Sequence, residues 1–306
     1  MRFKPYLYLR PQHLQTQTPL SVSHFLLFKH TQTTASAIFQ CAVLPDGTAL
    51  SPPRAPFGGI QCDDSCDYND ISQMLQCIED WARSSGLVRI VVQLPAACYN
   101  FTTNDLLLKC YTSKNYQKII KNLNHHVVVS SSVYEKTISS AEKRRLKKCW
   151  SAGFECELWK EPDIGIIYDF LNFCRSQKGY HLSMSLHQLG ALITTFPDEI
   201  MVFTVKDDQK IISLSVTVKV SRSAMYCFLS ASLPSYSAYS PSVLLIYTLY
   251  NFCQKADISV LDLGTSLDHH GAEKAGLIQF KENMGGLRSS KVTFLKNLST
   301  DLKIWS

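Results

Sequence analysis

The 306-residue sequence has no apolar run long enough to cross a lipid bilayer. A spanning helix needs about 20 apolar residues. The longest apolar stretch here, Val243–Cys253, is far shorter and is interrupted by Tyr247 and Asn251. The N-terminal segment carries basic residues but lacks the continuous apolar core of a signal peptide. We therefore expect a soluble protein of the cytoplasm, with no membrane span.

The sequence also lacks the short motifs that mark several enzyme classes. It contains no G-x-S-x-G nucleophile, no Walker phosphate loop and no H-E-x-x-H helix. Low-complexity tracts, solenoid repeats and long charged tails are absent as well. The chemistry of this chain must therefore be sought in less distinctive patterns.

The cysteines do not follow the spacing of a disulfide or metal framework. There are 11 of them, an odd number, and several, such as Cys98 and Cys174, fall within apolar runs. Such positions are typical of buried thiols in a reducing compartment. Cys62 and Cys66 form the closest pair, but no second pair follows at zinc spacing, and a structural zinc needs four ligands. We expect free thiols and no bound metal.

The composition is that of a folded globular protein, with 45% hydrophobic and 18% charged residues. A chain of 306 residues is long for one compact domain and suits two. The formal charge of +6 is mild. It leaves room for an anionic ligand without requiring nucleic acid as a partner.

The first half of the chain predicts an α/β lobe, because alternating and β-branched runs are interrupted by one strongly amphipathic helix. We expect a hairpin of His24–His30 with Ala35–Leu44, a rigid loop at Ser51–Gly59, a helix at Tyr68–Gly86, a strand at Leu87–Leu94, a helix at Tyr116–Leu123 and a strand at His125–Ser130.

The second half predicts a longer series of elements, opened by a basic helix. We expect helices at Ser139–Gly153, Ile164–Lys178, Leu186–Thr195, Ser240–Lys255 and Glu273–Met284, and strands at Phe154–Trp159, Ile200–Lys206, Ile211–Val220, Ala224–Leu229, Ile258–Leu263 and Lys291–Leu295. After the basic helix, the order β-α-α-β-β-β-α-β-α-β is similar to that of the GNAT acyltransferase fold. We place the lobe boundary at the start of the basic helix.

Several motifs resemble those of the Fem-type aminoacyltransferases and their tandem-GNAT relatives. SVLDLGTS at Ser259–Ser266, GLIQFK at Gly276–Lys281 and the following Gly285-Gly286 resemble the C-terminal signature of that family. The basic helix resembles its interlobe element. The resemblance implies an α/β (α+β) fold of two GNAT-like lobes, residues 1–138, reduced, and residues 139–306.

The resemblance also implies an activity. An acyl or aminoacyl group would move from an activated donor, acyl-CoA or aminoacyl-tRNA, to an amine in a cleft between the lobes. The acceptor would be an amine-bearing small molecule or a cell-wall-type precursor, and tRNA would be a further partner. A standard GNAT domain holds the CoA pyrophosphate on a glycine-rich loop. The corresponding stretch here, Ser232–Ser242, contains neither glycine nor arginine, so we expect poor binding of acetyl-CoA.

Two residues are candidates for catalysis. Asp262 lies at a strand end, where α/β folds bind ligands; the alternative is an aspartate that caps a turn. Lys281 follows Phe280 in a pair that the resemblance places near the acyl donor, where a lysine neutralises a developing oxyanion or a phosphate. The alternative for Lys281 is a solvated helix lysine.

Five further residues are candidates for donor or substrate binding. Arg54 stands in the rigid loop as a clamp for an anion, Tyr236 and Tyr239 offer hydroxyl donors, and Ser266 and Phe280 belong to the signature motifs. Packed tyrosines and a surface arginine are the alternatives. A further hypothesis makes Asp268-His269 a general base. For the whole chain, the alternative function is a non-catalytic binding protein that keeps the fold without a donor site.

Overall fold

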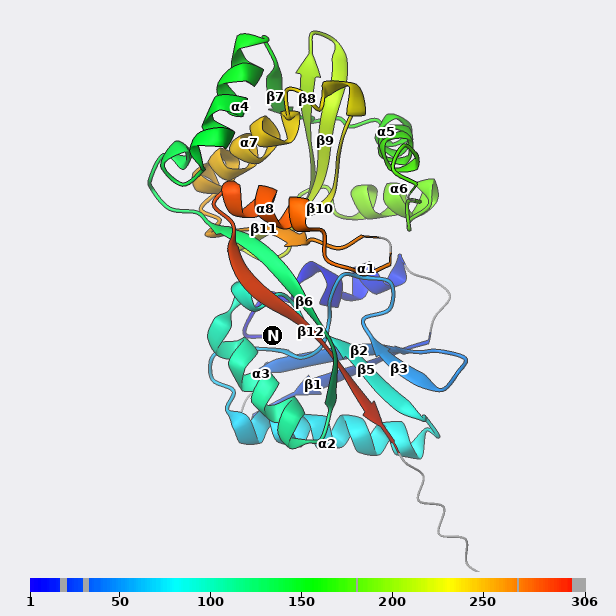
Figure 1. Cartoon of the computed structure of the whole chain (residues 1–306). Helices are drawn as coiled ribbons and strands as arrows, with labels where there is room; N and C mark the ends of the chain where they lie inside the picture. Colours follow the sequence, from blue (N-terminus) through cyan, green and yellow to red (C-terminus); the bar gives the residue numbers. More distant parts are fainter. Residues whose placement is uncertain (17–20, 30–32, 180, 269, 299–306) are drawn as a thin grey trace, which may run out of the picture. The chain divides into compact units, whose positions relative to one another are not determined.

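The computed structural model describes residues 1–306 except 17–20, 30–32, 180, 269 and 299–306. The chain forms two compact units (Figure 1): unit 1 comprises Met1–Asn122 with Ser290–Ser306, and unit 2 comprises Leu123–Ser289. Two strands, β6 (Gln117–Val128) and β12 (Leu287–Asn297), run from one unit into the other. The predicted lobe boundary between residues 138 and 139 stays a prediction.

Unit 1 is built on a mixed sheet. Strand β1 pairs antiparallel with β2, with Phe25 opposite Phe39, which confirms the predicted hairpin, although His30, the last residue of its first predicted strand, lies outside the described residues. Strand β3 pairs parallel with β5, and β5 pairs antiparallel with β12. The elements are η1 (Leu7–Leu9), α1 (Pro11–Gln15), β1 (Ser21–Leu27), β2 (Ala37–Val43), β3 (Thr48–Ser51), β4 (Gln61–Cys62), α2 (Tyr68–Ser84), β5 (Arg89–Gln93), η2 (Ala97–Tyr99) and α3 (Phe101–Ser113).

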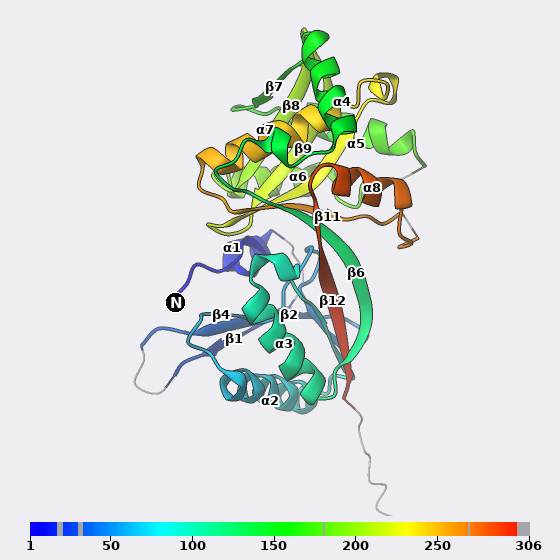
Figure 2. The ribbon, with the colours of Figure 1, turned by 60° about the vertical axis from the view of Figure 1, so that its left-hand side comes forward.

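Helix α2 shows why the predicted amphipathic helix forms. Asp67 caps it, because its side chain accepts from the Asp70 N–H while the Asp70 side chain accepts from the Asp67 N–H. The apolar residues at helical spacing, including Ile71, Leu75 and Ile78, are buried. They pack with α3 and the strands in one hydrophobic core, and Figure 2 shows α2 and α3 side by side.

The predicted helix at Tyr116–Leu123 is wrong, because these residues lead into and form part of β6. Their apolar spacing fits a helix, but Ile119 and Ile120 are exposed rather than packed. The helix of this region lies earlier, at α3, which the sequence interpretation missed. Helix α3 ends at Ser113, and Asn115 then takes a left-handed conformation (φ 61°) that redirects the chain into the extended strand.

Unit 2 has the strand order β7-β8-β9-β10-β11-β6. All neighbours in it are antiparallel except β10 and β11. The elements are η3 (Tyr134–Lys136), α4 (Ser140–Ser151), β7 (Glu155–Leu158), α5 (Ile164–Ser176), α6 (Leu186–Thr195), β8 (Ile200–Asp207), β9 (Lys210–Lys219), β10 (Ala224–Ser232), η4 (Pro234–Tyr236), α7 (Pro241–Lys255), β11 (Val260–Thr265) and α8 (Ala275–Asn283). They confirm the order of elements predicted for this half.

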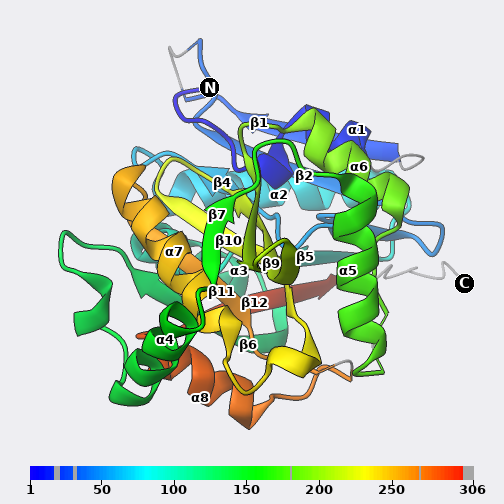
Figure 3. The ribbon, with the colours of Figure 1, turned by 90° about the horizontal axis from the view of Figure 1, so that it is seen from above.

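The helices of unit 2 lie on both faces of its sheet. Figures 1 and 3 show α4 and α7 on one face of β8 and β9, with α5 and α6 on the other. Helix α7 is buried around much of its circumference, with Val243, Leu245 and Leu249 almost fully covered. A helix that is apolar on most sides must be enclosed, and α7 packs against β8, β9, β10, β11 and α4.

Strands β10 and β11 stay together for only part of their length. They pair in parallel over Ala224–Tyr226 and Val260–Asp262. Beyond this point β10 has a register irregularity between Cys227 and Leu229, and β11 has one opposite β6 between Asp262 and Gly264. A bulge bends its strand, and the two strands part where these irregularities begin.

The 11 cysteines are free thiols in this structure. Among the described residues, no group of three or more His, Cys, Asp or Glu side chains is placed to hold a metal ion. Within the same described part of the chain, no helix has the length and apolar character needed to cross a membrane.

Candidate functional site

A cavity of about 380 Å³ opens in unit 2 where β10 and β11 part. Its walls come from both faces of the sheet. Helix α7 contributes Leu245 and Leu249, whereas α5, on the opposite face, contributes Arg175, and Lys178 follows just after the end of α5. Lys281 of α8 also lines the cavity. The opening therefore joins an apolar side to a cationic side.

Lys281 is a buried lysine of the cavity wall. Its side chain is buried, and Nζ donates to the carbonyl oxygens of Gly264 (2.9 Å) and Thr265 (2.8 Å). Burial lowers the pKa of Lys281 to about 8, although the nearby Asp262 carboxylate acts in the opposite direction. An ammonium carries three N–H donors, so one remains for a ligand in the cavity.

Asp262 lies behind Lys281 on β11 and is also buried. Its Oδ1 accepts from Asn124 Nδ2 (2.8 Å) and from the Gly264 N–H (2.8 Å). Gly264 has φ +73°, and a Cβ there would lie 3.2 Å from the ring of Tyr226. This glycine lets the backbone turn its N–H toward the carboxylate. Asp262 thus stands as a fixed negative charge that favours the ammonium form of Lys281.

Two histidines complete the buried polar cluster, and both come from β6. His126 is opposite Asp262 in the β6–β11 register. His125 is fully buried, with Nε2 3.8 Å from Glu282 Oε1, and Arg288 holds that carboxylate at 2.5 Å. Burial lowers the pKa of His125, and the Lys281 charge adds to this effect. His125 is therefore neutral at physiological pH.

Hydroxyl groups line the part of the cavity next to the start of α7. Ser232 of β10 and Ser242 of α7 both line it, and their Oγ atoms are 2.9 Å apart. Ser213 Oγ lies 2.8 Å from Ser232 Oγ. These three hydroxyls form a chain that offers polar contacts at the α7 end of an otherwise apolar wall.

The structure brings together some of the residues predicted from the sequence. Phe280 and Lys281 line the cavity, and Asp262 supports Lys281 through its charge. Ser266 is buried close by in sequence, and its Oγ has no hydrogen-bond partner among the described residues. Their predicted roles in catalysis and donor binding stay predictions.

The two predicted tyrosines lie elsewhere in unit 2. Tyr236 donates its hydroxyl to Asp207 Oδ2 at 2.8 Å. The ring of Tyr239 packs against Phe154 (5.1 Å between centroids), and Lys148 Nζ lies 4.7 Å from its centre. Neither tyrosine lines the cavity described above. Their role in donor binding stays a prediction.

Arg54 belongs to unit 1, where it is exposed at φ 47°. The loop that carries it is held firmly, because Gly58 N–H donates to the Gln93 carbonyl and Gly59 N–H donates to Ser51 Oγ. The rigidity predicted for Ser51–Gly59 is therefore visible in its hydrogen bonds. Asp268 is described, whereas His269, the other member of the predicted general-base pair, lies outside the described residues.

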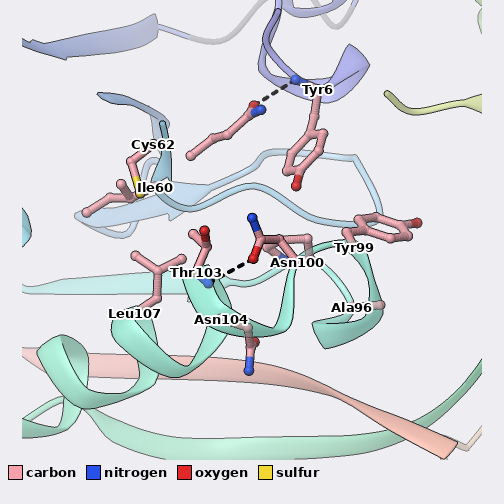
Figure 4. Close-up of a pocket in the computed structure, with 11 residues that line it drawn as sticks. Tyr6, Ile60, Cys62, Ala96, Tyr99, Asn100, Thr103, Asn104 and Leu107 are labelled. Carbon is pink, nitrogen blue, oxygen red and sulfur yellow. Dashed lines mark hydrogen bonds between the residues drawn. The ribbon is translucent and has the colours of Figure 1, made fainter. Parts of the chain in front are cut away.

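Unit 1 contains a much smaller hollow between η2, α3 and the N-terminal segment (Figure 4). Tyr6, Cys62 and Asn100 are among its lining residues, and its volume is about 30 Å³. A water molecule needs roughly 10–15 Å³ of such space. This hollow is thus too small for a substrate.

The sequence interpretation missed several residues of the cavity and its surroundings, including Asn124, Arg175 and Ser232. A signal for Asn124 was present, because Asn-His-His interrupts the apolar strand run that ends in Val127–Val129. A buried strand rarely carries three polar residues in a row without a function or a partner for each. Arg175 gave no such signal, since a basic residue in the last turn of a helix is ordinary.

The depressed pKa of Lys281 predicts how stability depends on pH. The folded protein disfavours the charged amine, so between pH 8 and the ordinary lysine pKa of 10.5 the unfolded chain binds one proton more than the folded chain. Stability of the wild type should therefore rise over this range relative to Lys281→Met, by about 3 kcal/mol. Urea unfolding of both proteins at pH 7.5 and 10.5 measures the difference, and equal changes in the two would contradict the depressed pKa.

Comparisons with known proteins address the fold of the chain. Residues 179–281, within unit 2, match the acetyltransferase (GNAT) domain model. The structure of FemX superposes with a TM-score of 0.70 at 11% identity, covering 95% of this chain and 92% of FemX. A tandem GNAT protein from the clavulanic acid biosynthesis pathway gives 0.56 at 9% identity, covering 97% and 86%. The C-terminal domain of a putative lysylphosphatidylglycerol synthetase from Agrobacterium fabrum gives 0.57 at 13% identity, covering 86% and 81%.

None of the curated proteins compared with the chain matches its sequence. The structural likenesses confirm the predicted fold, a mixed α/β fold of the tandem GNAT type that resembles the Fem proteins. Together with the GNAT domain match, this fold supports a general acyltransferase function.

Proposed function

We propose that this protein is an N-acyltransferase and that the acyl group is transferred in the cavity of unit 2. One observation carries the proposal: Lys281 is a buried amine on the cavity wall, with two N–H bonds to backbone carbonyls and a third donor available. Donors fixed in place before the reaction stabilise charge that develops in a transition state. A lysine held in this way is suited to bind a carbonyl oxygen.

The reaction needs no covalent intermediate on the protein. The lone pair of a free amine attacks the carbonyl carbon of a thioester or ester, and the carbonyl oxygen becomes an oxyanion that accepts the third N–H of Lys281. The C–N bond forms, the bond to the sulfur or oxygen of the donor breaks, and the proton of the amine leaves with that group. Cys227 also lines the cavity, but burial raises the pKa of its thiol, which makes it a poor nucleophile.

The two sides of the cavity suit two substrates. The apolar wall of α7 can hold an acyl chain, and the α5 side can admit an amine from the opposite face. Holding both reactants in one site supplies much of the rate enhancement of such transfers. The donor is acyl-CoA or aminoacyl-tRNA, and the acceptor is an amine-bearing small molecule or a cell-wall-type precursor. The likeness to FemX and to a putative lysylphosphatidylglycerol synthetase supports an acceptor of this kind.

Acetyl-CoA should not bind in the usual GNAT manner. A pyrophosphate cradle requires N–H groups that converge on the anion. Here Tyr236, Ser237, Tyr239, Ser240 and Val243 each donate their N–H to the carbonyl three residues earlier, and Pro241 has none. Calorimetry should detect no complex with a Kd near 1 µM, which corresponds to about −8 kcal/mol. A tight complex with the pyrophosphate on Ser235–Ser242 would show an ordinary acetyltransferase instead.

The same hydrogen bonds favour the alternative, a binding protein with this fold and no working donor site. One experiment separates the two functions. The full-length protein is incubated with acyl-CoAs of two to twelve carbons, or with a mixture of aminoacyl-tRNAs, together with a pool of amines. Mass spectrometry then searches for new amides that the Lys281→Met variant does not form. Stable binding without any amide product from either donor class would establish the binding protein.

A further inference from the structure

Arg175 is a cation with no anionic partner among the described residues. It lies in the last turn of α5 and lines the cavity of unit 2. Its Nε is buried and has no hydrogen-bond partner among the described residues. A guanidinium carries five N–H donors and stays charged in proteins. Burial of such a donor without a partner is costly, and the cost is removed when an anion binds there.

The charges around Arg175 do not supply that anion. Of the described residues that line the cavity, none carries a carboxylate, whereas Lys178 and Lys281 add two further amines. Tyr226 lies near enough for its hydroxyl, if ionised, to influence Arg175, but burial raises the pKa of that phenol, so it is neutral. Asp262 is directed to Asn124 and Gly264 instead. The α5 side of the cavity is therefore positively charged when empty.

The size of the cavity restricts what the anion is attached to. Arg175, at the α5 side, and Lys281, at the proposed reaction centre, share one space of about 380 Å³. A substrate that reaches both must carry its anionic group close to its reacting amine. A planar guanidinium matches the two oxygens of a carboxylate. An amine next to a carboxylate is the arrangement found in amino acids.

We propose that the acyl acceptor is an amino acid, or a short peptide with a free carboxylate, and that Arg175 binds its carboxylate. This inference rests on the proposed function and specifies its second substrate. The reaction is then R–CO–X + H₂N–CHR′–COO⁻ → R–CO–NH–CHR′–COO⁻ + HX, where X is the thiol or alcohol part of the donor. The C–N bond forms, the C–X bond breaks, and the amine proton leaves with X. The product joins an apolar chain to a carboxylate. The apolar wall of α7 suits the chain, and the cationic α5 side of the cavity suits the carboxylate.

Binding of a product mimic tests the inference without knowledge of the donor. Calorimetry compares N-octanoylglycine with its neutral amide, N-octanoylglycinamide, on the full-length protein. We expect the carboxylate to bind at least about 10-fold more tightly, as one charge-assisted contact allows. Arg175→Gln should bind the amide as the wild type does and lose the preference for the carboxylate. Arg175→Lys should retain part of it.

Arg222→Gln is the matched control, because Arg222 is an exposed arginine of unit 2 that does not line the cavity. It should keep the full preference. N-octanoylaminomethylphosphonate serves as a third ligand, and tighter binding of this ligand than of the carboxylate would replace the amino acid by a phosphate-bearing acceptor and overturn the inference. Arg175 donates no side-chain hydrogen bond within the described residues and its burial is costly, so we expect Arg175→Gln to unfold at a temperature no lower than that of the wild type.

The failures of the two proposals are distinguishable. Equal binding of carboxylate and amide to the wild type overturns the role of Arg175 and leaves the acyltransferase proposal intact. A preference for the carboxylate that persists in Arg175→Gln also overturns the role of Arg175 and leaves the acyltransferase proposal intact. If neither ligand binds the wild type, the cavity does not hold this acyl product and the inference falls, whereas the proposed function is decided separately by the amide screen with acyl-CoAs and aminoacyl-tRNAs.

Discussion

Replacing Lys281 with methionine should lower kcat for acyl transfer by about 100- to 1,000-fold, the usual effect of removing one donor from an oxyanion site. The methionine fills similar space but offers no N–H to the carbonyl oxygen. KM for the donor should change much less, because this contact strengthens mainly in the transition state. Steady-state kinetics on the substrate pair found by the amide screen measures both constants.

The fold should survive this substitution. The variant loses two hydrogen bonds, and it leaves the carbonyls of Gly264 and Thr265 without the donor that Nζ provides. It also removes an amine whose charged form is disfavoured by burial, so the two effects oppose each other. Lys255→Met is the matched control, since Lys255 is an exposed lysine of α7 outside the cavity. A Lys281→Met protein that keeps more than a fifth of the wild-type kcat would refute the catalytic role of the lysine.

The elements of unit 2 were predictable from the sequence because each carries a local signal. Asp163 and Ser185 cap α5 and α6, because the side chain of each accepts an N–H of the first turn of its helix. Pro241 opens α7 at a position where a helix tolerates proline. The failure at Tyr116–Leu123 has the opposite cause. Its apolar spacing is helical, and only pairing with strands distant in sequence makes it extended.

The candidate site was predictable only where its residues share a motif. Asp262 and Lys281 stand in consecutive signature segments, so the sequence indicates both. Arg175 comes from a helix more than 80 positions earlier and reaches the same cavity only because β10 and β11 part there. The parting depends on irregular pairing between strands, which has no marker in the sequence other than Gly264. The α5 side of the cavity therefore depends on how distant segments pack together, which residue types alone do not reveal.

The tyrosines illustrate a limit of arguments from position in the sequence. Tyr236 and Tyr239 precede the N-terminus of α7, where a GNAT domain would bind the donor phosphates. In the folded chain, however, Tyr236 donates its hydroxyl to Asp207, and the ring of Tyr239 contacts Phe154 and Lys148. A hydroxyl that is already hydrogen-bonded must break that bond to serve a ligand. For this reason the cavity residues, and not the loop residues, carry the proposed function.

Replacing Gly285 with alanine should destabilise the protein more than any other single change considered above. Gly285 follows α8, the helix that carries Lys281, and has φ +78°. A Cβ there would lie 2.3 Å from Thr137 Cγ2 and 3.2 Å from the Thr137 carbonyl oxygen. Both segments are fixed, because Tyr134 donates to the Met284 carbonyl (2.6 Å) and Ser139 N–H donates to the Asn283 carbonyl (2.8 Å). Neither can move aside cheaply.

The expected loss combines two costs. A left-handed alanine costs about 1–2 kcal/mol, and the overlap adds about 1–3 kcal/mol of overpacking, so urea unfolding should show a loss of about 2–5 kcal/mol. Gly153→Ala isolates the first cost, since Gly153 has φ +76° and a Cβ there meets nothing within 4 Å. Thr137→Ser removes the Cγ2 methyl group, so in that background the cost of Gly285→Ala should fall toward that of Gly153→Ala. If Gly285→Ala and Gly153→Ala cost the same in the wild-type background, the close contact between Gly285 and Thr137 does not exist in solution.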